Sequence, residues 1–423
     1  MATLSVIIPA LNEENGIADI IDRTLAVRPD LVEVGLELEL IVVDDGSTDR
    51  TAEIVTSYGT QVRLIQHEVN KGYGAAIKTG FQQATGEWLA FLDADGTYPP
   101  EAFPAMYQAA LRENADLVIG SRMAGAESEM PLVRRVGNLF FAGLVSFVGK
   151  TSVSDSASGQ RILRREVLEK LYPLPNGLNF TPVMSTRALH EDVRMIEVPI
   201  VYHERQGRSK LHPIKDGIRF LKTILWTGLS YNPVRLFGTV GGLGVLFAAL
   251  VGAVLILVRA SGSTYVSPLG AFVLFFAVVS AVVGISIFTF GATLNYLAGL
   301  MRGETVRLGL FGKPIFEPSL DHHFGWMGLA AAAVGVVISV LALVANAGSP
   351  APDFASLFFY FLGSAMFIMV GIQLIVSWIL MRVLEEMNKR KQQAAQDLGV
   401  AWNAPANGRE TATEAHVSPK QIA

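Results

Sequence analysis

The sequence predicts an α/β domain built on a mixed or parallel sheet, followed by an all-α membrane domain of four transmembrane helices. Three observations lead to this prediction. Short apolar runs alternate with helical stretches in the first half, four long apolar stretches occupy the second half, and charge is unevenly distributed. The chain has 423 residues, of which 51% are hydrophobic and only 17% charged. Soluble domains carry roughly 25% charged residues, so a wholly soluble protein is not expected.

Charged residues are scarce mainly in the second half of the chain. The chain has 34 basic and 38 acidic residues, and only nine of these charged residues lie between Val234 and Met381. We therefore expect a soluble domain over residues 1–210, an interfacial segment over 211–232, a membrane domain over 233–381 and a polar tail over 382–423. The tail is poor in large apolar residues and is predicted to be disordered.

Composition also excludes several classes of protein. The net charge of -4 argues against a nucleic-acid partner, because such proteins carry a basic face. The chain has no cysteine, which excludes disulfide scaffolds, zinc–thiolate sites and thiol nucleophiles.

The first domain shows a regular alternation of strand and helix signals. The expected strands are Leu4–Pro9, Leu38–Val43, Val62–Gln66, Trp88–Leu92 and Asp116–Ile119. The expected helices are Gly16–Val27, Thr48–Tyr58, Gly72–Ala84 and Pro100–Arg112. Strands that are apolar throughout and alternate with helices are typical of a parallel sheet that is covered on both faces.

Polar motifs follow four of these strands, where ligands of such sheets bind. They are Pro9-Ala10-Leu11-Asn12-Glu13-Glu14, Asp44-Asp45-Gly46-Ser47-Thr48-Asp49, Asp93-Ala94-Asp95-Gly96 and Gly120-Ser121-Arg122. Two carboxylates one residue apart can hold Mg²⁺ or Mn²⁺. Each motif alone could be a turn or a helix start, but their succession predicts one site at the sheet edge. A fifth motif, Asn70-Lys71-Gly72-Tyr73-Gly74, is either a tight turn or a set of backbone amides near phosphate.

Four apolar stretches approach the ~20 residues that a helix needs to span a bilayer. They are Val234–Val258, about Leu269–Leu294, Trp326–Ala345 and Leu357–Met381, with Trp226, Tyr265, Trp326 and Tyr360 near their ends as interfacial aromatics. Basic residues follow the second and fourth stretches (Arg302, Arg307, Lys313, Arg382, Lys389, Arg390, Lys391), whereas the other two loops hold only Arg259. The positive-inside rule then predicts a multi-pass protein of the cell (inner) membrane, with the first domain and both termini cytoplasmic.

Two segments beside the membrane stretches mix apolar and charged residues. Leu211–Tyr231 has the spacing of an amphipathic helix that lies on the membrane surface. The loop from Gly303 to Gly325 has a similar composition. His322 and His323 in that loop are adjacent and do not share a helix face, so we expect a role at the lipid headgroups there rather than a metal site.

Taken together, the motifs resemble glycosyltransferase family 2. They include Ser5-Val6-Ile7-Ile8-Pro9, Val42-Val43-Asp44-Asp45-Gly46-Ser47, Asp93-Ala94-Asp95 with Pro99-Pro100, Gly120-Ser121-Arg122, Asp155-Ser156-Ala157-Ser158-Gly159-Gln160-Arg161, Glu197-Val198-Pro199-Ile200 and Arg205-Gln206-Gly207-Arg208-Ser209-Lys210-Leu211. Within the family the chain is most similar to the dolichyl-phosphate-mannose-synthase-like polyprenyl-phosphate glycosyltransferases. The resemblance covers about Leu4–Leu211 and implies a GT-A (Rossmann-like) fold.

The resemblance implies an inverting, metal-dependent hexosyl transfer at the cytoplasmic membrane face. The donor would be a UDP- or GDP-linked sugar, the acceptor a polyprenyl phosphate of undecaprenyl or dolichyl type, and the cofactor Mg²⁺ or Mn²⁺. The lipid bilayer is a further partner, and a homo-oligomer is left open.

The resemblance also implies roles for particular residues. The nucleotide pocket would be lined by Pro9, Leu11, Glu13, Val43 and Asp45, and Lys71 would also bind substrate. Asp93 and Ala94 would lie beside the ribose and diphosphate, and Asp95 with Asp93 would bind the metal. The cationic pocket for the phosphates would comprise Arg122, Arg135, Arg205 and Lys210. Thr97 stands where many relatives have a glutamine, so its hydroxyl or a water would complete the metal shell.

A lipid phosphate is already an anion and needs little help from a base. We therefore expect Asp155 to orient the acceptor rather than to act as an essential base. Two other functions remain open: transfer to another membrane lipid or to a polysaccharide, and a non-catalytic role in binding or transporting a sugar-lipid. The Gln-x-x-Arg-Trp motif typical of processive synthases in this superfamily is missing, which disfavours polysaccharide synthesis.

Overall fold

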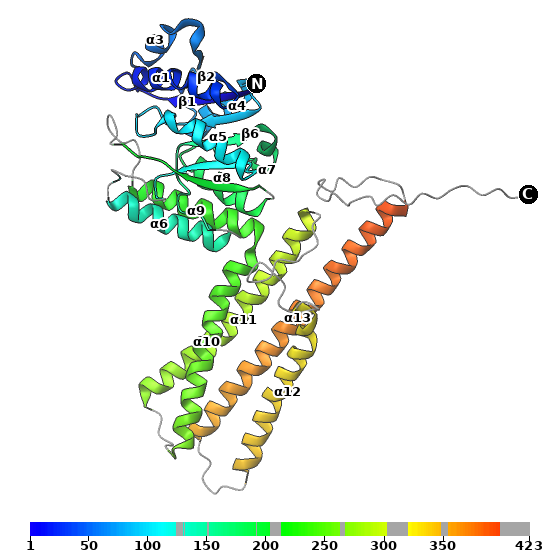
Figure 1. The fold of residues 1–423 in the computed structure, drawn as a ribbon. Coiled ribbons are helices and arrows are strands. Elements are labelled where there is room, and N and C mark those ends of the chain that lie inside the picture. Colours follow the sequence, from blue (N-terminus) through cyan, green and yellow to red (C-terminus); the bar gives the residue numbers. More distant parts are fainter. Residues whose placement is uncertain are drawn as a thin grey trace, which may run out of the picture. The chain divides into compact units, whose positions relative to one another are not determined.

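The computed structural model describes residues 1–123, 130, 132–149, 152–191, 193–203, 213–262, 267–302, 320–347 and 354–397. It divides into two compact units, Met1–Asn232 and Pro233–Ala423 (Figure 1).

The first unit is built on a seven-stranded sheet with the order β3-β2-β1-β4-β6-β5-β7. The strands are β1 (Ala2–Ala10), β2 (Leu36–Asp44), β3 (Arg63–Gln66), β4 (Trp88–Phe91), β5 (Leu117–Ser121), β6 (Arg161–Arg164) and β7 (Met195–Pro199). Only β6 runs antiparallel to its neighbours, β4 and β5. The sheet is therefore mixed, and β1, β2, β4 and β5 end at the same edge, as the sequence predicts.

Helices cover both faces of this sheet. They are α1 (Ile17–Ala26), α2 (Arg28–Glu33), α3 (Thr51–Thr56), α4 (Tyr73–Gln83), α5 (Phe103–Arg112), α6 (Leu132–Val148), α7 (Leu168–Leu171), α8 (Phe180–His190) and α9 (Pro213–Tyr231), with 3₁₀ turns η1 (Gly59–Gln61), η2 (Pro100–Ala102) and η3 (Arg165–Val167). Ile8 packs into the core beneath α1 and α5, whereas the next residue toward the N-terminus, Ile7, packs beneath α4 and α8. This alternation explains why the strand reads as continuously apolar.

Helices α6 and α9 of this unit lie side by side (Figure 1), and both carry exposed apolar residues. Helix α9 confirms the predicted amphipathic helix from Pro213 onward, while Leu211 falls outside the described residues. Its Phe220 is buried and meets Phe141 of α6 edge-on, with ring centroids 5.8 Å apart. Helix α6 was not among the predicted elements.

The second unit consists of α10 (Pro233–Ala260), α11 (Pro268–Arg302), α12 (Leu320–Asn346) and α13 (Phe354–Asp397). By length and composition all four are able to cross a membrane, which confirms the four predicted apolar helices. The predicted aromatic Tyr265, and most of the predicted interfacial loop, lie outside the described residues.

The prediction of a disordered tail from residue 382 is wrong for its first part. Helix α13 continues to Asp397, and residues 398–423 lie outside the described ones. Ion pairs one turn apart support the extension: Lys389 lies 3.2 Å from Glu385, and Arg390 lies 3.3 Å from Glu386. Such pairs stabilise an exposed helix without a packed core.

The two helical hairpins of the second unit repeat one another at an interval of 87 residues, as Gly241 and Gly328 show. Phe237-Gly238-Thr239-Val240-Gly241 corresponds to Phe324-Gly325-Trp326-Met327-Gly328, and Val283-Gly284-Ile285 to Val370-Gly371-Ile372. The contacts repeat as well. Gly241 lies against the backbone of Gly284, and Gly328 lies against the backbone of Gly371 in the same way. Small residues let membrane helices approach this closely, so the same glycine pair lies at the helix contact of each hairpin.

We predict that Gly328→Ala destabilises the membrane unit by about 1–3 kcal/mol, the usual cost of overpacking. The new Cβ would lie 2.6 Å from the Gly371 carbonyl oxygen. Gly252→Ala is the matched control, because a Cβ on Gly252 meets nothing within 4 Å, and alanine is the better helix former. Thermal unfolding of the detergent-solubilised protein measures both. Equal midpoints for the two variants would contradict the glycine contact.

Candidate active site

The segments that follow β1 and β2 are joined by hydrogen bonds. The Asn12 backbone amide donates to the Ser47 hydroxyl at 2.9 Å, and the Thr48 amide donates to Asn12 Oδ1 at 2.8 Å. Within the strands, Pro9 pairs in register with Val43. The structure thus brings Pro9, Val43 and the segment holding Leu11 and Glu13 to one part of the sheet edge, as a shared nucleotide pocket requires.

Asp45 is buried and fully engaged by the protein. Its Oδ1 accepts a hydrogen bond from the Lys71 amide at 2.9 Å, and its Oδ2 accepts one from the Gly72 amide at 2.8 Å. The His67 ring lies 2.7 Å away. These two amides therefore anchor the loop of residues 70–74 instead of offering themselves to phosphate. The Lys71 side chain is exposed.

Glycines shape this loop so that it delivers a tyrosine to the next strand end. Gly72 has φ +101°, and a Cβ there would lie 2.5 Å from the Asn176 carbonyl oxygen. The following residue, Tyr73, donates its hydroxyl to Asp93 Oδ1 at 2.8 Å. Burial and the charge of Asp93 raise the pKa of Tyr73, so the phenol stays protonated as a donor.

The two predicted metal carboxylates follow β4. Asp95 is buried, and its Oδ1 accepts the Thr97 amide at 3.2 Å and the Thr97 hydroxyl at 2.5 Å. The Thr97 hydroxyl therefore orients Asp95; its proposed contact with a metal stays a prediction. Ala94 is buried between the two aspartates. Gly159 packs directly on Asp93, because a Cβ on Gly159 would lie 2.5 Å from Asp93 Oδ2.

These donors fit a divalent cation that is shared with substrate. No group of three or more His, Cys, Asp or Glu side chains suited to a metal occurs in the part of the chain that the structure describes. Within these described residues, Asp93 and Asp95 would supply two carboxylates rather than a complete cage. Mg²⁺ in phosphate-using enzymes is commonly held this way, with substrate phosphates and water as the other ligands.

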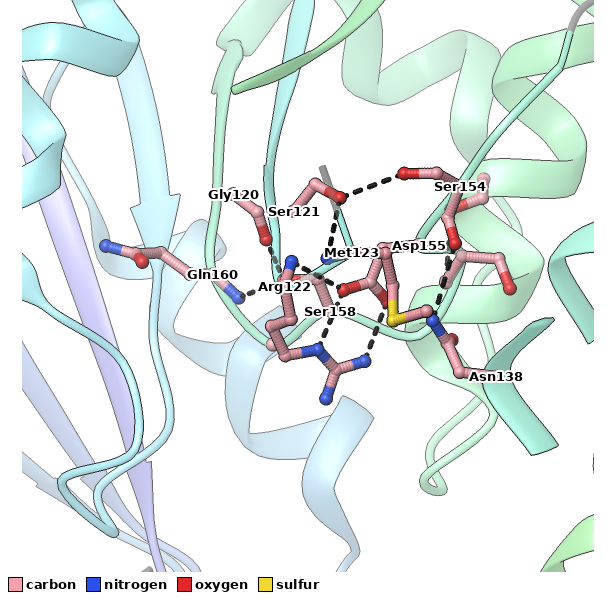
Figure 2. Close-up of polar contacts among 12 residues, drawn as sticks. Gly120, Ser121, Arg122, Met123, Asn138, Ser154, Asp155, Ser158 and Gln160 are labelled. Carbon is pink, nitrogen blue, oxygen red and sulfur yellow. Dashed lines mark hydrogen bonds and ion pairs between the residues drawn. The ribbon is translucent and has the colours of Figure 1, made fainter. Parts of the chain in front are cut away.

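A bidentate ion pair joins Arg122, after β5, to Asp155 (Figure 2). Arg122 Nε donates to Asp155 Oδ2 and Nη2 donates to Oδ1, both at 2.7 Å, and the Arg122 amide donates to Oδ2 at 3.0 Å. The guanidinium also lies 5.8 Å and 5.3 Å from the ring centroids of Tyr98 and Tyr202, a cation–π arrangement. Arg122 is thus held in one orientation.

The pKa of Asp155 explains why it is a poor base. Burial alone would raise the pKa of this carboxyl, but the charge and hydrogen bonds of Arg122 outweigh burial and lower it. Asp155 is therefore ionised at neutral pH with both oxygens engaged. This geometry agrees with the expectation that Asp155 orients other groups rather than removing a proton.

Residues 158–160 connect the ends of β4 and β5. The Ser158 hydroxyl donates to the Gly120 carbonyl at 2.6 Å, and the Gly159 amide donates to the Tyr98 hydroxyl at 2.7 Å. Gln160 is buried and donates through Nε2 to the Pro99 carbonyl at 2.6 Å. Figure 2 shows Gln160 and Ser158 beside the Arg122–Asp155 pair.

Arg135, which the resemblance also placed in the cationic pocket, is not brought to this pair. Arg135 is exposed on α6 and has no hydrogen bond or ion pair with a described residue of the site. Arg205 and Lys210 lie outside the described residues. The sequence patterns predicted no role for Tyr73, Tyr98 or Tyr202. Of these three, only Tyr73 lies within one of the predicted motifs, the segment of residues 70–74.

Comparison with known proteins decides the family. The sequence model of glycosyl transferase family 2 matches residues 5–172. A dolichyl-phosphate hexose transferase of Haloferax volcanii is 32% identical over 225 residues, which cover 52% of this chain and 92% of the relative. The chain belongs to glycosyl transferase family 2. It is therefore a glycosyltransferase, and its first unit has the GT-A fold that the resemblance implied.

Further relatives extend the match. An undecaprenyl-phosphate 4-deoxy-4-formamido-L-arabinose transferase of Photorhabdus laumondii is 28% identical, over 72% of this chain and 91% of the relative. The low-salt glycan biosynthesis hexosyltransferase Agl6 of Haloferax volcanii is 34% identical, and the chain spans 54% of its length. Residues 233–395 match a domain of unknown function (DUF8752).

Solved structures also resemble the chain. Glucosyl-3-phosphoglycerate synthase from Mycobacterium tuberculosis, in complex with Mn²⁺, UDP and glucosyl-3-phosphoglycerate, is 25% identical with a TM-score of 0.41. The match covers 53% of this chain and 80% of that one.

We predict that Asp155→Asn lowers the free energy of unfolding by about 3 kcal/mol near neutral pH, because it leaves a buried guanidinium without its counter-charge. The folded pKa of Asp155 is lowered, so its stabilising contribution is present above about pH 4 and is lost as pH falls through the folded pKa. Wild type and variant should therefore converge in acid.

Chemical denaturation followed by tryptophan fluorescence measures this difference. Asp19→Asn is the control, because Asp19 forms a surface pair with Arg23 at 3.8 Å, and such pairs contribute about 0.5 kcal/mol or less. A loss for Asp155→Asn that does not change with pH would contradict the assigned charge pair.

Proposed function

We propose that this glycosyltransferase transfers a hexose from a nucleoside-diphosphate sugar to a polyprenyl phosphate, with inversion and with a divalent metal, at the cytoplasmic face of a membrane. One observation carries the proposal. Two carboxylates and a clamped arginine lie at one sheet edge of a chain that also contains four membrane-length helices. The names of the relatives, a dolichyl-phosphate and an undecaprenyl-phosphate sugar transferase, support the acceptor.

The donor would bind at the ends of β1, β2 and β4. Pro9, Leu11, Glu13 and Val43 would line the base and ribose side of the pocket, and the strand pairing of Pro9 with Val43 supports this. Asp93 and Asp95 would hold Mg²⁺ or Mn²⁺, which when bound offsets the charge that develops on the departing diphosphate. Thr97 and Tyr73 keep the two carboxylates in place.

The acceptor would bind beside Arg122. Asp155 engages Nε and Nη2 of this guanidinium, which leaves Nη1 to donate to an acceptor phosphate oxygen. Because the phosphate is already ionised, no base is needed, in agreement with the low pKa of Asp155. Attack from the side opposite the diphosphate inverts the anomeric carbon.

The surface formed by α6 and α9 suits a bilayer. Leu139 and Phe140 of α6 and Trp226 of α9 are exposed, as are the cationic Lys215 and Lys222. Exposed apolar residues among lysines are typical of helices that lie at a lipid headgroup layer. A single residue, Asn232, separates α9 from the first membrane-length helix.

We predict that the purified protein, given Mn²⁺ and undecaprenyl phosphate, moves label from one of several nucleotide sugars into the lipid phase. UDP-glucose and GDP-mannose are the first donors to try, and the anomeric configuration of the product, read by NMR, tests inversion. Asp95→Asn should lower kcat at least 100-fold, by analogy with the loss of other key electrostatic groups. Asp30→Asn, at an exposed aspartate of α2, should have no effect.

Two results would count against this proposal. The first is a well-folded protein that labels no polyprenyl phosphate from any donor. The second is full activity in Asp95→Asn. Transfer to a different lipid or to a polysaccharide in the same assay would instead favour the alternative acceptors.

We predict that Leu139→Ser raises KM for the long-chain acceptor roughly fivefold. Moving the exposed half of a leucine side chain from water into lipid contributes about 1 kcal/mol of transfer free energy. KM for a short, water-soluble isoprenyl phosphate should stay unchanged. Leu111→Ser on α5 is the matched control: the exposed fractions of Leu139 and Leu111 are 53% and 50%. Equal effects of the two substitutions on the long-chain acceptor would refute a membrane-facing α6.

A further inference from the structure

The hydroxyl of Tyr73 reaches a predicted metal ligand from a different part of the chain. It donates to Asp93 Oδ1 at 2.8 Å, whereas Gly159 packs against Asp93 Oδ2 from the other strand end. Both oxygens of the carboxylate are thus next to protein groups. A carboxylate has about four acceptor positions, so a hydrogen bond from a hydroxyl to one oxygen can fix its plane and is compatible with binding a cation.

The loop that carries Tyr73 is itself rigidly held. Asp45 accepts the amides of Lys71 and Gly72, and it is buried with a side-chain exposure of 4%. A Cβ on Gly74 would collide with the Pro175 carbonyl and lie 2.8 Å from the Phe180 ring. Hence the loop can approach the segment before α8 only with glycine at this position. Hydrogen bonds therefore link Asp45 to the loop, and the loop to Asp93 through Tyr73.

The Tyr73 ring and its hydroxyl have separable roles. The ring packs edge-on against Phe180, with centroids 6.4 Å apart, and this contact belongs to the core beneath α4 and α8. The hydroxyl adds the hydrogen bond to Asp93. Removing the oxygen alone should therefore leave the packing intact and release only the carboxylate.

We infer that Tyr73 is a positioning residue that orients Asp93 for a divalent cation, and that Asp45 acts through the same loop to place it. This inference rests on the proposed function, in which Asp93 and Asp95 share a metal with the donor diphosphate. Partners that hydrogen-bond to metal ligands fix the orientation of those ligands, and their loss typically costs 10- to 100-fold in metal affinity or activity.

The test is the Mn²⁺ affinity of Tyr73→Phe, measured by electron paramagnetic resonance in the presence of UDP and without turnover. We expect the dissociation constant for Mn²⁺ to rise about tenfold. In kinetic assays the apparent KM for Mn²⁺ should rise as well, while KM for the lipid acceptor stays the same. The control is Tyr58→Phe, which removes a similar tyrosine–aspartate hydrogen bond, 2.9 Å long, between Tyr58 and Asp22.

A second variant disturbs the same hydrogen bond through the loop that carries Tyr73. Asp45→Asn weakens the anchor of the loop and should also weaken Mn²⁺ binding, even if Tyr73→Phe fails to fold. Unchanged Mn²⁺ affinity in a folded Tyr73→Phe, a wild type that binds no Mn²⁺ with UDP, or an equal loss in Tyr58→Phe would overturn the inference.

The two proposals fail in different ways. A wild type that transfers no sugar, but whose Mn²⁺ affinity falls on Tyr73→Phe, would contradict the proposed reaction and keep the positioning role. A wild type that transfers sugar, with a Tyr73→Phe variant of unchanged Mn²⁺ affinity, would contradict only the positioning role.

Discussion

The buried ion pair between Arg122 and Asp155 is the constraint on which the rest of the site depends. A carboxylate with no exposure is strongly destabilising unless it is paired and hydrogen-bonded. Asp155 meets this need with three donors from Arg122. The Asp155 amide is in turn held by Glu197 of β7 at 2.9 Å. The pair therefore fixes the loop before β6 to the ends of β5 and β7, and Gly159 in that loop is thereby held against Asp93.

The acidic residues of the sheet edge divide into two groups by what surrounds them. Asp45 and Asp155 each accept several hydrogen bonds from protein donors and hold segments of the chain in place. Asp93 and Asp95 are each oriented by a neighbouring hydroxyl, from Tyr73 and Thr97 respectively. A hydroxyl orients a carboxylate without neutralising it, whereas a guanidinium neutralises it.

Much of the fold could be predicted because its signals are local. Continuous apolar runs identified the strands up to β5, and their polar ends converge on one edge as expected. The roles of individual acidic residues could not be read in this way. Asp45 is expected to line the nucleotide pocket, and the structure adds that its carboxylate accepts hydrogen bonds from amides 26 and 27 positions away. Such a contact depends on how the 70–74 loop folds back, which no local pattern reveals. The contact of Tyr73 with Asp93 is hidden for the same reason.

The membrane unit shows the converse relation between sequence and structure. Composition identifies its four helices but not how they pair, because almost every position is apolar. The pairing rests on a few glycines, and the 87-residue interval between Gly284 and Gly371 becomes visible only once the contacts are known. Apart from these glycines, most positions of the two hairpins differ. Lipid-facing positions accept almost any apolar side chain, whereas a backbone contact across two helices accepts only the smallest residue. The two hairpins therefore share glycines at the positions where two helix backbones touch.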